Sequence, residues 1–311
     1  MVQTRIKVKQ VIYRIIYQSS VNRVLRNLGK LLSPWLPEGL RIPPSGILTV
    51  HLKDSSFKFC TNQTNYTTQL VFWQGPYAME YTAIFDILIR RCTCFFDIGA
   101  HAGYYSMIAA EVNPQIHVVS FEPASGPYQY LEWNIRLNHF ENRIHSYQMA
   151  LGDRNGTAAF LEATHHKYKY LKHNLLAISN LNERKEGRTM KKINVPISTM
   201  DNFVHVHHEP IPDIIKMDTE GTENLILANS EEILKTRPVI ICETLFNKIE
   251  SELEEIMARH GYNFYNHVRG KLHRVKSIRR SHDNGVRDCF FVHPSKEFLV
   301  SEFVDSSTKR S

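Results

Sequence analysis

The sequence predicts an α/β fold in which a mostly parallel sheet is covered by helices on both faces. From residue 93 onward, short apolar runs alternate with segments of helical spacing, as they do where strands are joined by helical crossovers. The first run leads into a glycine turn, Asp97-Ile98-Gly99-Ala100-His101-Ala102-Gly103, and the next run ends in Glu122. Glycines let the backbone turn with positive φ and let a ligand approach it closely. Together these features predict a nucleoside pocket at the carboxyl ends of two adjacent parallel strands.

The first 46 residues are expected to form a basic amphipathic extension followed by a linker. Residues 1–37 contain seven of the chain's 38 lysines and arginines and no acidic residue, so the other 31 balance the 31 acidic residues. Apolar residues recur at helical spacing within 8–16 and again within 21–32, and prolines and glycines from 33 to 46 break any helix. Such a basic helix can lie on an anionic membrane surface. The extension could equally well dock on the chain's own domain, and a third alternative is that it is a transit peptide.

The rest of the chain is expected to divide into a small β element with a lead-in helix at 47–92, a main domain at 93–295 and a tail at 296–311. Alternation of apolar and polar residues in 47–69 predicts a small antiparallel element, and 77–91 has helical spacing. In the main domain, strands are expected at 94–98, 117–121, 144–149, 214–217, 239–243, 263–266 and 289–293, and helices at 104–112, 127–137, 222–234 and 248–260.

Two basic stretches interrupt this alternation. Residues 163–192 are rich in histidine, lysine and asparagine, and an insertion this long within a compact domain is usually functional or disordered. We expect it to be a lid over the substrate, with a solvated loop as the alternative. Its histidines have no carboxylate at metal-ligand spacing, so no zinc site is predicted. The second stretch, 268–280, is expected to form a hairpin extension or a loop before the last strand.

The spacing of the glycines favours one nucleoside cofactor over another. Dinucleotide sites use G-x-G-x-x-G, because the pyrophosphate must meet bare backbone at a helix N-terminus. This chain instead has Gly99-x-x-x-Gly103, with Asp97 two residues before the first glycine. An acid at that position would repel a pyrophosphate and attract the ammonium of a methionine moiety. S-adenosylmethionine therefore fits, with its ribose on Glu122, which follows Gly99 by 23 positions.

A second group of charged residues is predicted to reach the same edge of the sheet. An apolar strand would deliver Lys216, Asp218 and Glu220 there, and the following strand ends in Glu243. Charged residues on a central strand are rarely structural, because buried charges are costly unless they are paired. Glu223, in the first turn of the next helix, is expected only to cap that helix. The other four are candidates for the reacting site, because ligands of open α/β sheets bind at this rim.

Six short sequence blocks follow one another in order. They are DIGAHAGYYS from Asp97, SFEP from Ser120, ALGD from Ala150, STMDNF from Ser198, IKMDTEG from Ile215 and CET from Cys242. Over roughly residues 70–295 their order and spacing make the chain similar to the FkbM family of S-adenosylmethionine-dependent methyltransferases. The resemblance implies a Rossmann-like class I methyltransferase, with a seven-stranded, mostly parallel sheet whose last strand is antiparallel, and usually O-methylation.

The resemblance also implies roles for individual residues. Asp97, Gly99 and Gly103 would hold the methionine part of the cofactor, Glu122 the ribose and Asp153 the adenine edge. The full set of expected cofactor-binding residues is Asp97, Gly99, Ala100, His101, Gly103, Tyr105, Ser106, Glu122 and Asp153. The chain departs from the family at His101, where asparagine is usual. Imidazole can still form one hydrogen bond, but a pH dependence could appear.

The expected chemistry assigns roles to the charged rim. Methyl transfer from a sulfonium requires mainly in-line alignment and exclusion of water, and a hydroxyl acceptor must also lose a proton. Asp218 is the leading candidate for the base or for orienting the acceptor, followed by Glu220 and Glu243. Lys216 could lower the pKa of a nearby acid or hold the nascent oxyanion. A divalent metal on Asp218 and Glu243 is a minor alternative, and the site is predicted to work without one.

The expected acceptor is a hydroxyl on a sugar, a glycan or another small polar molecule, which the polar composition of 163–192 would suit. A nucleic-acid partner is not expected, because no aromatic platform accompanies the basic charge.

The five cysteines lack disulfide or zinc spacing, which predicts a cytoplasmic setting, with peripheral membrane contact through residues 1–33 left open. Two other functions remain open: a non-catalytic membrane-associated protein with a vestigial nucleoside pocket, and an NAD-dependent oxidoreductase, which the glycine spacing disfavours.

Overall fold

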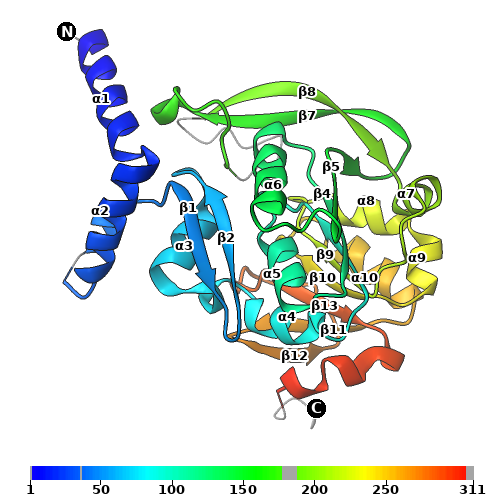
Figure 1. The fold of residues 1–311 in the computed structure, drawn as a ribbon. Coiled ribbons are helices and arrows are strands. Elements are labelled where there is room, and N and C mark those ends of the chain that lie inside the picture. The colour runs from blue at the N-terminus through cyan, green and yellow to red at the C-terminus, as the bar shows by residue number, and fades with distance from the viewer. Residues whose placement is uncertain (1, 36, 177–187, 306–311) are drawn as a thin grey trace.

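The computed structural model describes residues 2–35, 37–176 and 188–305. The centre of this part is a sheet of eight strands in the order β12-β11-β13-β10-β9-β3-β4-β5 (Figure 1). The strands are β3 (Cys94–Ile98), β4 (His117–Phe121), β5 (Ile144–Tyr147), β9 (Ile214–Met217), β10 (Val239–Glu243), β11 (Asn263–Val268), β12 (Lys271–Val275) and β13 (Asp288–Val292). From β10 to β5 all neighbours are parallel, whereas β13 is antiparallel to β10 and β11. The predicted α/β fold with an antiparallel last strand is confirmed.

The described sheet has one strand more than the seven predicted. The seven expected strands all occur, with ends that differ by at most two residues. The additional strand, β12, comes from the basic stretch after residue 268 and pairs antiparallel with β11 at the edge of the sheet. Arg269 and Gly270 connect them with φ angles of 49° and 77°, as in the tight turns that join hairpin strands. The basic stretch therefore begins as a hairpin.

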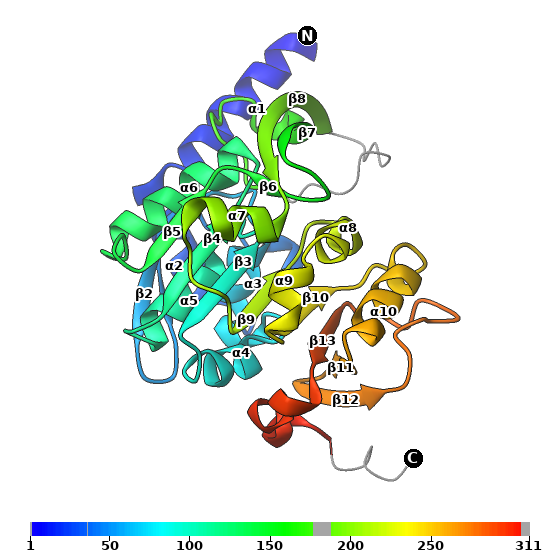
Figure 2. The same ribbon diagram turned by 90° about the vertical axis from the view of Figure 1, so that its right-hand side faces the viewer.

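Helices cover both faces of the sheet, because successive side chains of a strand point to opposite faces. On β3, Phe95 belongs to one core cluster and Phe96 to the other. The first face carries α4 (Thr82–Ile89), α5 (Tyr104–Val112) and α6 (Ser125–Leu137), and the second carries α7 (Met200–His207), α8 (Glu223–Ala228), α9 (Glu231–Lys235) and α10 (Glu250–Arg259). Figure 2 shows the two helical layers on either side of the sheet.

The predicted helix at 222–234 is two helices, α8 and α9. At the end of α8, the Ser230 hydroxyl donates a hydrogen bond to the carbonyl of Ile226 over 2.6 Å. The carboxylate of Asp201, on α7, accepts hydrogen bonds from the backbone amides of Glu232 and Ile233. These amides are free donors of a new helix start. A cap supplied by another helix explains why the periodicity of 222–234 did not predict the break.

A second sheet stands apart from the central one and consists of β6 (Ala150–Leu151), β7 (Gly156–His165) and β8 (Arg188–Ser198). β7 and β8 pair antiparallel over their full overlap, from Gly156 with Ile197 to His165 with Arg188. The ends of the stretch 163–192 are therefore strands, which corrects the expectation of a loop there, whereas the role of the stretch as a lid stays a prediction. Their polar composition gave too weak an apolar alternation to reveal them. Residues 177–187 of that stretch lie outside the described residues.

The N-terminal part begins with two helices, α1 (Val2–Ile16) and α2 (Ser19–Leu31), that lie along one edge of the molecule (Figure 1). A hairpin of β1 (Gly46–His51) and β2 (Ser56–Thr61) follows, then α3 (Tyr66–Gln74). The short 3₁₀ helices are η1 (Glu38–Leu40), η2 (Pro76–Ala78), η3 (His166–Tyr168), η4 (Pro294–Leu299) and η5 (Ser301–Phe303). The predicted helical stripes and antiparallel element are thus present, and the four-part division of the chain stays a prediction. In the described residues, no helix has the length and apolar character needed to cross a membrane.

Candidate active site

The glycine turn after β3 is held against the ends of two neighbouring strands. The amides of Gly99 and Ala100 both donate to the carbonyl of Phe121, at the end of β4, over 3.0 and 2.9 Å. Gly99 has φ 73°, and a Cβ there would lie 2.0 Å from the carbonyl oxygen of Asp218, after β9. Gly103, at φ 85°, directly precedes α5. Only glycine allows this turn to pass so close to the next strand.

Glu122 is buried at the end of β4 and organises the same turn. Its two carboxylate oxygens accept hydrogen bonds from the amides of His101 and Ala124, over 2.8 and 2.7 Å. Burial raises the pKa of Glu122 to about 7, against the lowering effect of these two amides. Each oxygen keeps a further lone pair, so the carboxylate can accept two hydroxyl groups in addition.

A buried lysine connects the turn to the charged rim. Lys216 donates from Nζ to the carbonyl of Gly99 over 2.8 Å, and Nζ lies 3.4 Å from Asp97 and 3.9 Å from Asp218. Burial alone would lower the pKa of Lys216, but the two carboxylates outweigh it and the pKa is raised. The other oxygen of Asp97 accepts a hydrogen bond from Ser106 over 2.5 Å. Asp97 is thus fully buried beneath the turn, between α5 and β9.

An acid-lined pocket of about 240 Å³ opens beside Asp218. Four carboxylates line it, together with one arginine and one histidine; these residues are Glu80, Asp218, Glu243, Asp288, Arg287 and His267. Burial and the neighbouring charges of Asp218 and Glu220 raise the pKa of Glu243 to about 9. Burial and the charge of Glu80 likewise raise the pKa of Asp288. At neutral pH this pocket therefore holds protons on some of its carboxyl groups, which makes them hydrogen-bond donors.

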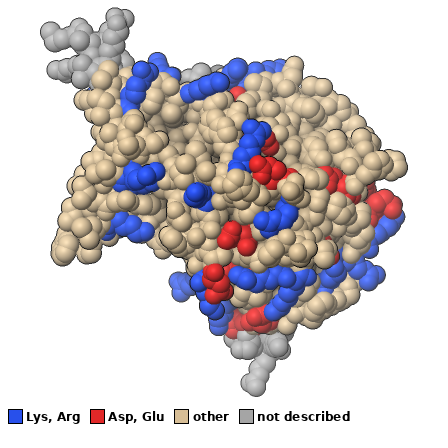
Figure 3. All heavy atoms as spheres, viewed as in Figure 1, with Lys and Arg blue, Asp and Glu red and all other residues tan. Residues whose placement is uncertain are grey.

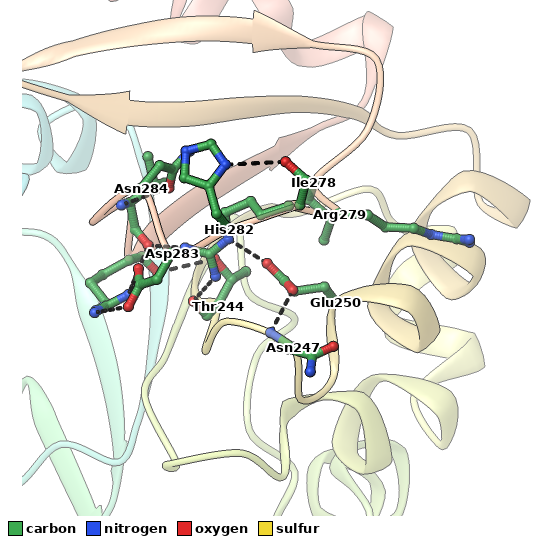
Figure 4. A network of polar contacts seen from close by, with 12 residues as sticks. Thr244, Asn247, Glu250, Ile278, Arg279, His282, Asp283 and Asn284 are labelled. Atoms are coloured by element: carbon green, nitrogen blue, oxygen red, sulfur yellow. Dashed lines mark hydrogen bonds and ion pairs between the residues drawn. The ribbon is translucent and has the colours of Figure 1, made fainter.

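One wall of this pocket is fixed by a buried ion pair between Arg280 and Glu250. Figure 4 shows Glu250 with Thr244 and Asn247 near it. The guanidinium of Arg280 contacts the carboxylate of Glu250, donates to the carbonyl of Thr244 over 2.7 Å and also donates to the carbonyl of Val286. Glu250 in turn accepts from the amide of Asn247 over 2.8 Å. These bonds tie the segment that carries Arg287 to the loop after β10. The wall is therefore an ordered part of the fold.

Most of the predicted site residues meet at this edge of the sheet. The Tyr105 hydroxyl donates to Glu80 over 3.0 Å, so that side chain reaches the acid-lined pocket. Glu220 lies near enough to Glu243 to affect its pKa. Asp153 is different: its ion pair, over 3.0 Å, is with the neighbouring Arg154, and its role at an adenine stays a prediction. The carboxylate of Glu223 accepts from the amide and hydroxyl of Thr219, which fits its expected structural role.

The imidazole of His101 is buried and forms a hydrogen bond with the backbone of Leu175, in the stretch after β7. Burial and the charge of Lys216 lower the pKa of His101 to about 4, so the ring is neutral at physiological pH. In the described part of the chain Nε2 has no hydrogen-bond partner. Leu175, which is buried nearby, donates its amide to Thr64 over 2.7 Å. His173 accepts through its carbonyl from Asn62 over 3.0 Å. Residues 170–176 thus form a strap that is bonded to the loop before α3.

The sequence did not indicate Glu80, His267, Arg287 or Asp288 as site residues. Asp288 pairs with Glu243 in the register of β10 and β13. The sequence did contain one indication of Asp288, which is an acid at the start of the last apolar run. Because β13 runs antiparallel to β10, the start of β13 lies beside the end of β10, where Glu243 is. Glu80 comes from a loop, and His267 comes from β11, which lies next to the edge strand β12. Only the tertiary fold brings them to the pocket.

The strand order, the glycine turn after β3 and the acid after β4 define a Rossmann-like class I methyltransferase fold. The family model described as the methyltransferase FkbM domain matches residues 97–264, more than half of the chain. The chain belongs to this family, as the sequence blocks predicted. No curated protein matches the chain.

Three solved structures that are similar to the chain are methyltransferases by their descriptions. One is a methyltransferase FkbM from Methylobacillus flagellatus KT, with 14% identity and a TM-score of 0.43; the match covers 73% of this chain and 55% of that one. Another is a precorrin-6y C5,15-methyltransferase from Geobacter metallireducens GS-15, with 13% identity, a TM-score of 0.39 and coverage of 68% and 86%. A third is a putative caffeoyl-CoA O-methyltransferase from Staphylococcus aureus, with 13% identity, a TM-score of 0.38 and coverage of 67% and 78%.

Proposed function

We propose that this chain transfers a methyl group from S-adenosylmethionine to a hydroxyl on a sugar, a glycan or another small polar acceptor. The observation that carries the proposal is the position of the Gly99 turn between Glu122 and Asp218. The turn is bonded to the end of β4 on one side and touches the Asp218 carbonyl on the other. A ribose-binding acid and a candidate base therefore flank one stretch of bare backbone. Membership of the FkbM family supports methyl transfer as the reaction class.

The residues around the turn fit a methionine-bearing nucleoside. The free lone pairs of Glu122 suit the two hydroxyls of a ribose. Gly99 and Gly103 leave the backbone open to a ligand, since neither carries a Cβ. Asp97 is bound to Ser106 and Lys216 beneath the turn. In this proposal Asp97 shapes the turn through these two contacts, because the Lys216 ammonium 3.4 Å away balances its charge.

The chain's own residues would prepare the acceptor. When bound, the cofactor supplies an already activated methyl group on its sulfonium. Asp218, partly exposed at the end of β9, accepts the proton of the acceptor hydroxyl. Glu243 is protonated at neutral pH, because its pKa is raised to about 9, and it donates a hydrogen bond that orients the acceptor. Lys216 acts as a positioning residue through Gly99, and Glu220 supports the protonated state of Glu243.

The acceptor pocket suits a molecule rich in hydroxyl groups. Carboxylates accept hydrogen bonds from hydroxyls, and protonated carboxyls donate them. With both kinds of group on its walls, the pocket offers complementary partners to a sugar. Arg287 and His267 add donors on the side of β13 and β11. The strap at 170–176 lies over the neighbouring turn, where it supports the predicted role of this stretch as a cover.

Titration calorimetry of the purified chain with S-adenosylmethionine, and in parallel with NAD, tests the cofactor. We expect heat of binding with the first and none with the second. A chain that is folded by circular dichroism but binds only NAD would contradict the proposal. A screen for transfer of a labelled methyl group to sugars, glycans and polyols, with amines for comparison, tests the acceptor. Cofactor binding without transfer to any of them would instead indicate a binding protein with a vestigial pocket.

A further inference from the structure

Helix α2 is attached to the body of the molecule by its polar face. Asn22 and Arg26 are 0% and 4% exposed, although both are strongly polar. Arg26 donates to the carbonyls of Ser45 and Ile47 over 2.6 and 2.8 Å, and Asn22 accepts from the Ser45 amide over 2.7 Å. Lys30, one turn further on, donates to the carbonyl of Phe72 over 2.8 Å. These residues are four apart, so they form one stripe of the helix.

Helix α1 is attached in a similar way. The rings of Tyr13 and Tyr17 pack edge-to-face on Tyr168 at 5.6 and 5.5 Å. The side chain of Gln10 donates to the carbonyl of Lys167 over 2.9 Å. Both helices thus contact the body through polar and aromatic groups. This is the reverse of the usual arrangement, in which a helix buries its apolar stripe.

Nine apolar side chains from the described part of these helices and from the turn after α2 consequently face outward. We call them the outer stripe: Val11, Ile12, Ile15, Val21, Val24, Leu28, Leu31, Leu32 and Trp35, all of them exposed. Leu31 and Trp35 are 73% and 80% exposed, close to the values of free side chains. On α2 the stripe recurs at intervals of three and four residues, opposite the bonded face. A contiguous apolar stripe of this length on a surface marks an interaction site.

The charge of the two helices indicates which surface the outer stripe meets. Residues 1–37 carry seven lysines and arginines and no acidic residue, while the rest of the chain is balanced. Where the edge formed by α1 and α2 is not grey, Figure 3 shows blue and tan atoms and no red. Arg26 and Lys30 are bonded to the body, but Lys9, Arg14 and Arg23 are exposed. Exposed basic groups of this kind are attracted to anionic headgroups while the apolar side chains of the stripe enter the acyl boundary. A tryptophan at the end of the stripe suits the same interface.

We propose that α1 and α2 bind the surface of an anionic phospholipid bilayer through the outer stripe, with the α/β domain held on the aqueous side. The body cannot cover the outer stripe without giving up the bonds of Asn22 and Arg26 on the opposite face. Neither helix is long and apolar enough to span a bilayer, so the contact is peripheral. The two sequence alternatives, docking on the domain and lying on a membrane, are thereby reconciled: each uses a different face of the same helices.

Flotation of the full chain with phosphatidylcholine vesicles, with and without phosphatidylglycerol, tests the proposal. The chain should float with the anionic vesicles, less so at high salt, and remain unbound with the neutral ones. The double variant L28Q/L31Q should reduce the bound fraction by about tenfold, because it removes apolar contact from the outer stripe. The matched control is Phe298→Gln, at an exposed phenylalanine of η4, which should leave flotation unchanged.

Two results would overturn the proposal. One is a chain that fails to float with anionic vesicles although its circular dichroism shows the folded state. The other is analytical ultracentrifugation showing that the chain self-associates without lipid and that L28Q/L31Q abolishes this, because the outer stripe would then join two copies. Since both exchanged leucines are exposed, the variant should unfold at the same temperature as the unchanged chain. That measurement separates loss of binding from loss of fold.

Discussion

Lys216 donates a hydrogen bond from Nζ to the carbonyl oxygen of Gly99 over 2.8 Å. The same ammonium lies between the carboxylates of Asp97 and Asp218. One buried side chain therefore joins the proposed cofactor turn, the acid beneath it and the candidate base. This arrangement makes Lys216 more important for the geometry of the site than its place on an apolar strand suggests, and it fits a positioning role better than direct contact with the acceptor.

Replacing Lys216 with methionine should destabilise the fold and weaken cofactor binding together. The side chain keeps its length, but Asp97 is left as a buried carboxylate with no cationic partner. We expect the free energy of unfolding in urea to fall by about 3 kcal/mol, as when one member of a buried ion pair is removed. Lys235→Met, at an exposed lysine of α9, is the control and should leave the unfolding midpoint unchanged. An equally stable Lys216→Met chain would show that Asp97 does not depend on the ammonium.

Replacing Glu122 with alanine should weaken the binding of S-adenosylmethionine by about 2–4 kcal/mol, because two charged hydrogen bonds to the ribose are lost. The amides of His101 and Ala124 also lose their acceptor, so some loss of stability is expected as well. Titration calorimetry measures the affinity, and a thermal melt separates the two effects. Glu141→Ala, at an exposed acid after α6, is the control. An unchanged affinity in the Glu122 variant would place the ribose elsewhere.

The sequence predicted the central strands correctly, because strands that are buried on both faces appear as continuous apolar runs. The apolar runs that became β3, β4, β9 and β10 are continuous because parallel strands are covered by helices on both sides. Their ends carry Glu122, Asp218 and Glu243, and parallel strands bring such ends to one rim. For this reason the turn, the rim and most of its acids could be predicted without coordinates.

The sequence did not predict the elements and side chains whose positions depend on contacts between distant segments of the chain. The start of α9 is set by Asp201 on α7, which no periodicity reveals. Glu80 and His267 approach the rim only when the segments before β3 and after α10 fold back. Likewise, β7 and β8 form a sheet outside the core, where the rule of apolar alternation is weak. The sequence therefore indicated the residues of the proposed cofactor side and left those of the proposed acceptor side incomplete.

Replacing Glu243 with glutamine should make the chain more stable at alkaline pH. Burial and nearby carboxylates raise the pKa of Glu243 in the folded chain to about 9, from the ordinary value of 4.5 that it has in the unfolded chain. The folded chain thus keeps a proton that the unfolded chain has released, and the free energy of unfolding falls as pH rises between these values. Glutamine cannot ionise, so at pH 8 the variant should gain more than about 1 kcal/mol.

Urea unfolding at several pH values measures this gain. The difference between Glu243→Gln and the unchanged chain should grow from near pH 5 toward pH 9, whereas Glu141→Gln, at an exposed acid, should follow the unchanged chain throughout. Methyl transfer by Glu243→Gln should persist at neutral pH, since glutamine still donates a hydrogen bond to the acceptor. A difference that is constant with pH would mean that Glu243 is ionised in the folded chain at neutral pH.

Replacing His101 with asparagine should leave cofactor binding within about twofold at every pH between 6 and 8. His101 has φ 52°, a left-handed conformation that asparagine adopts readily, and its backbone amide, which binds Glu122, is retained. Its pKa is lowered to about 4 by burial and by Lys216, so its ring does not titrate in this range. Glu122, with a pKa of about 7, does titrate there, and its ionised form is the better acceptor for ribose hydroxyls. Affinity measured by calorimetry should therefore rise with pH through about 7 in both chains. A rise that disappears in His101→Asn would assign the titration to the imidazole instead.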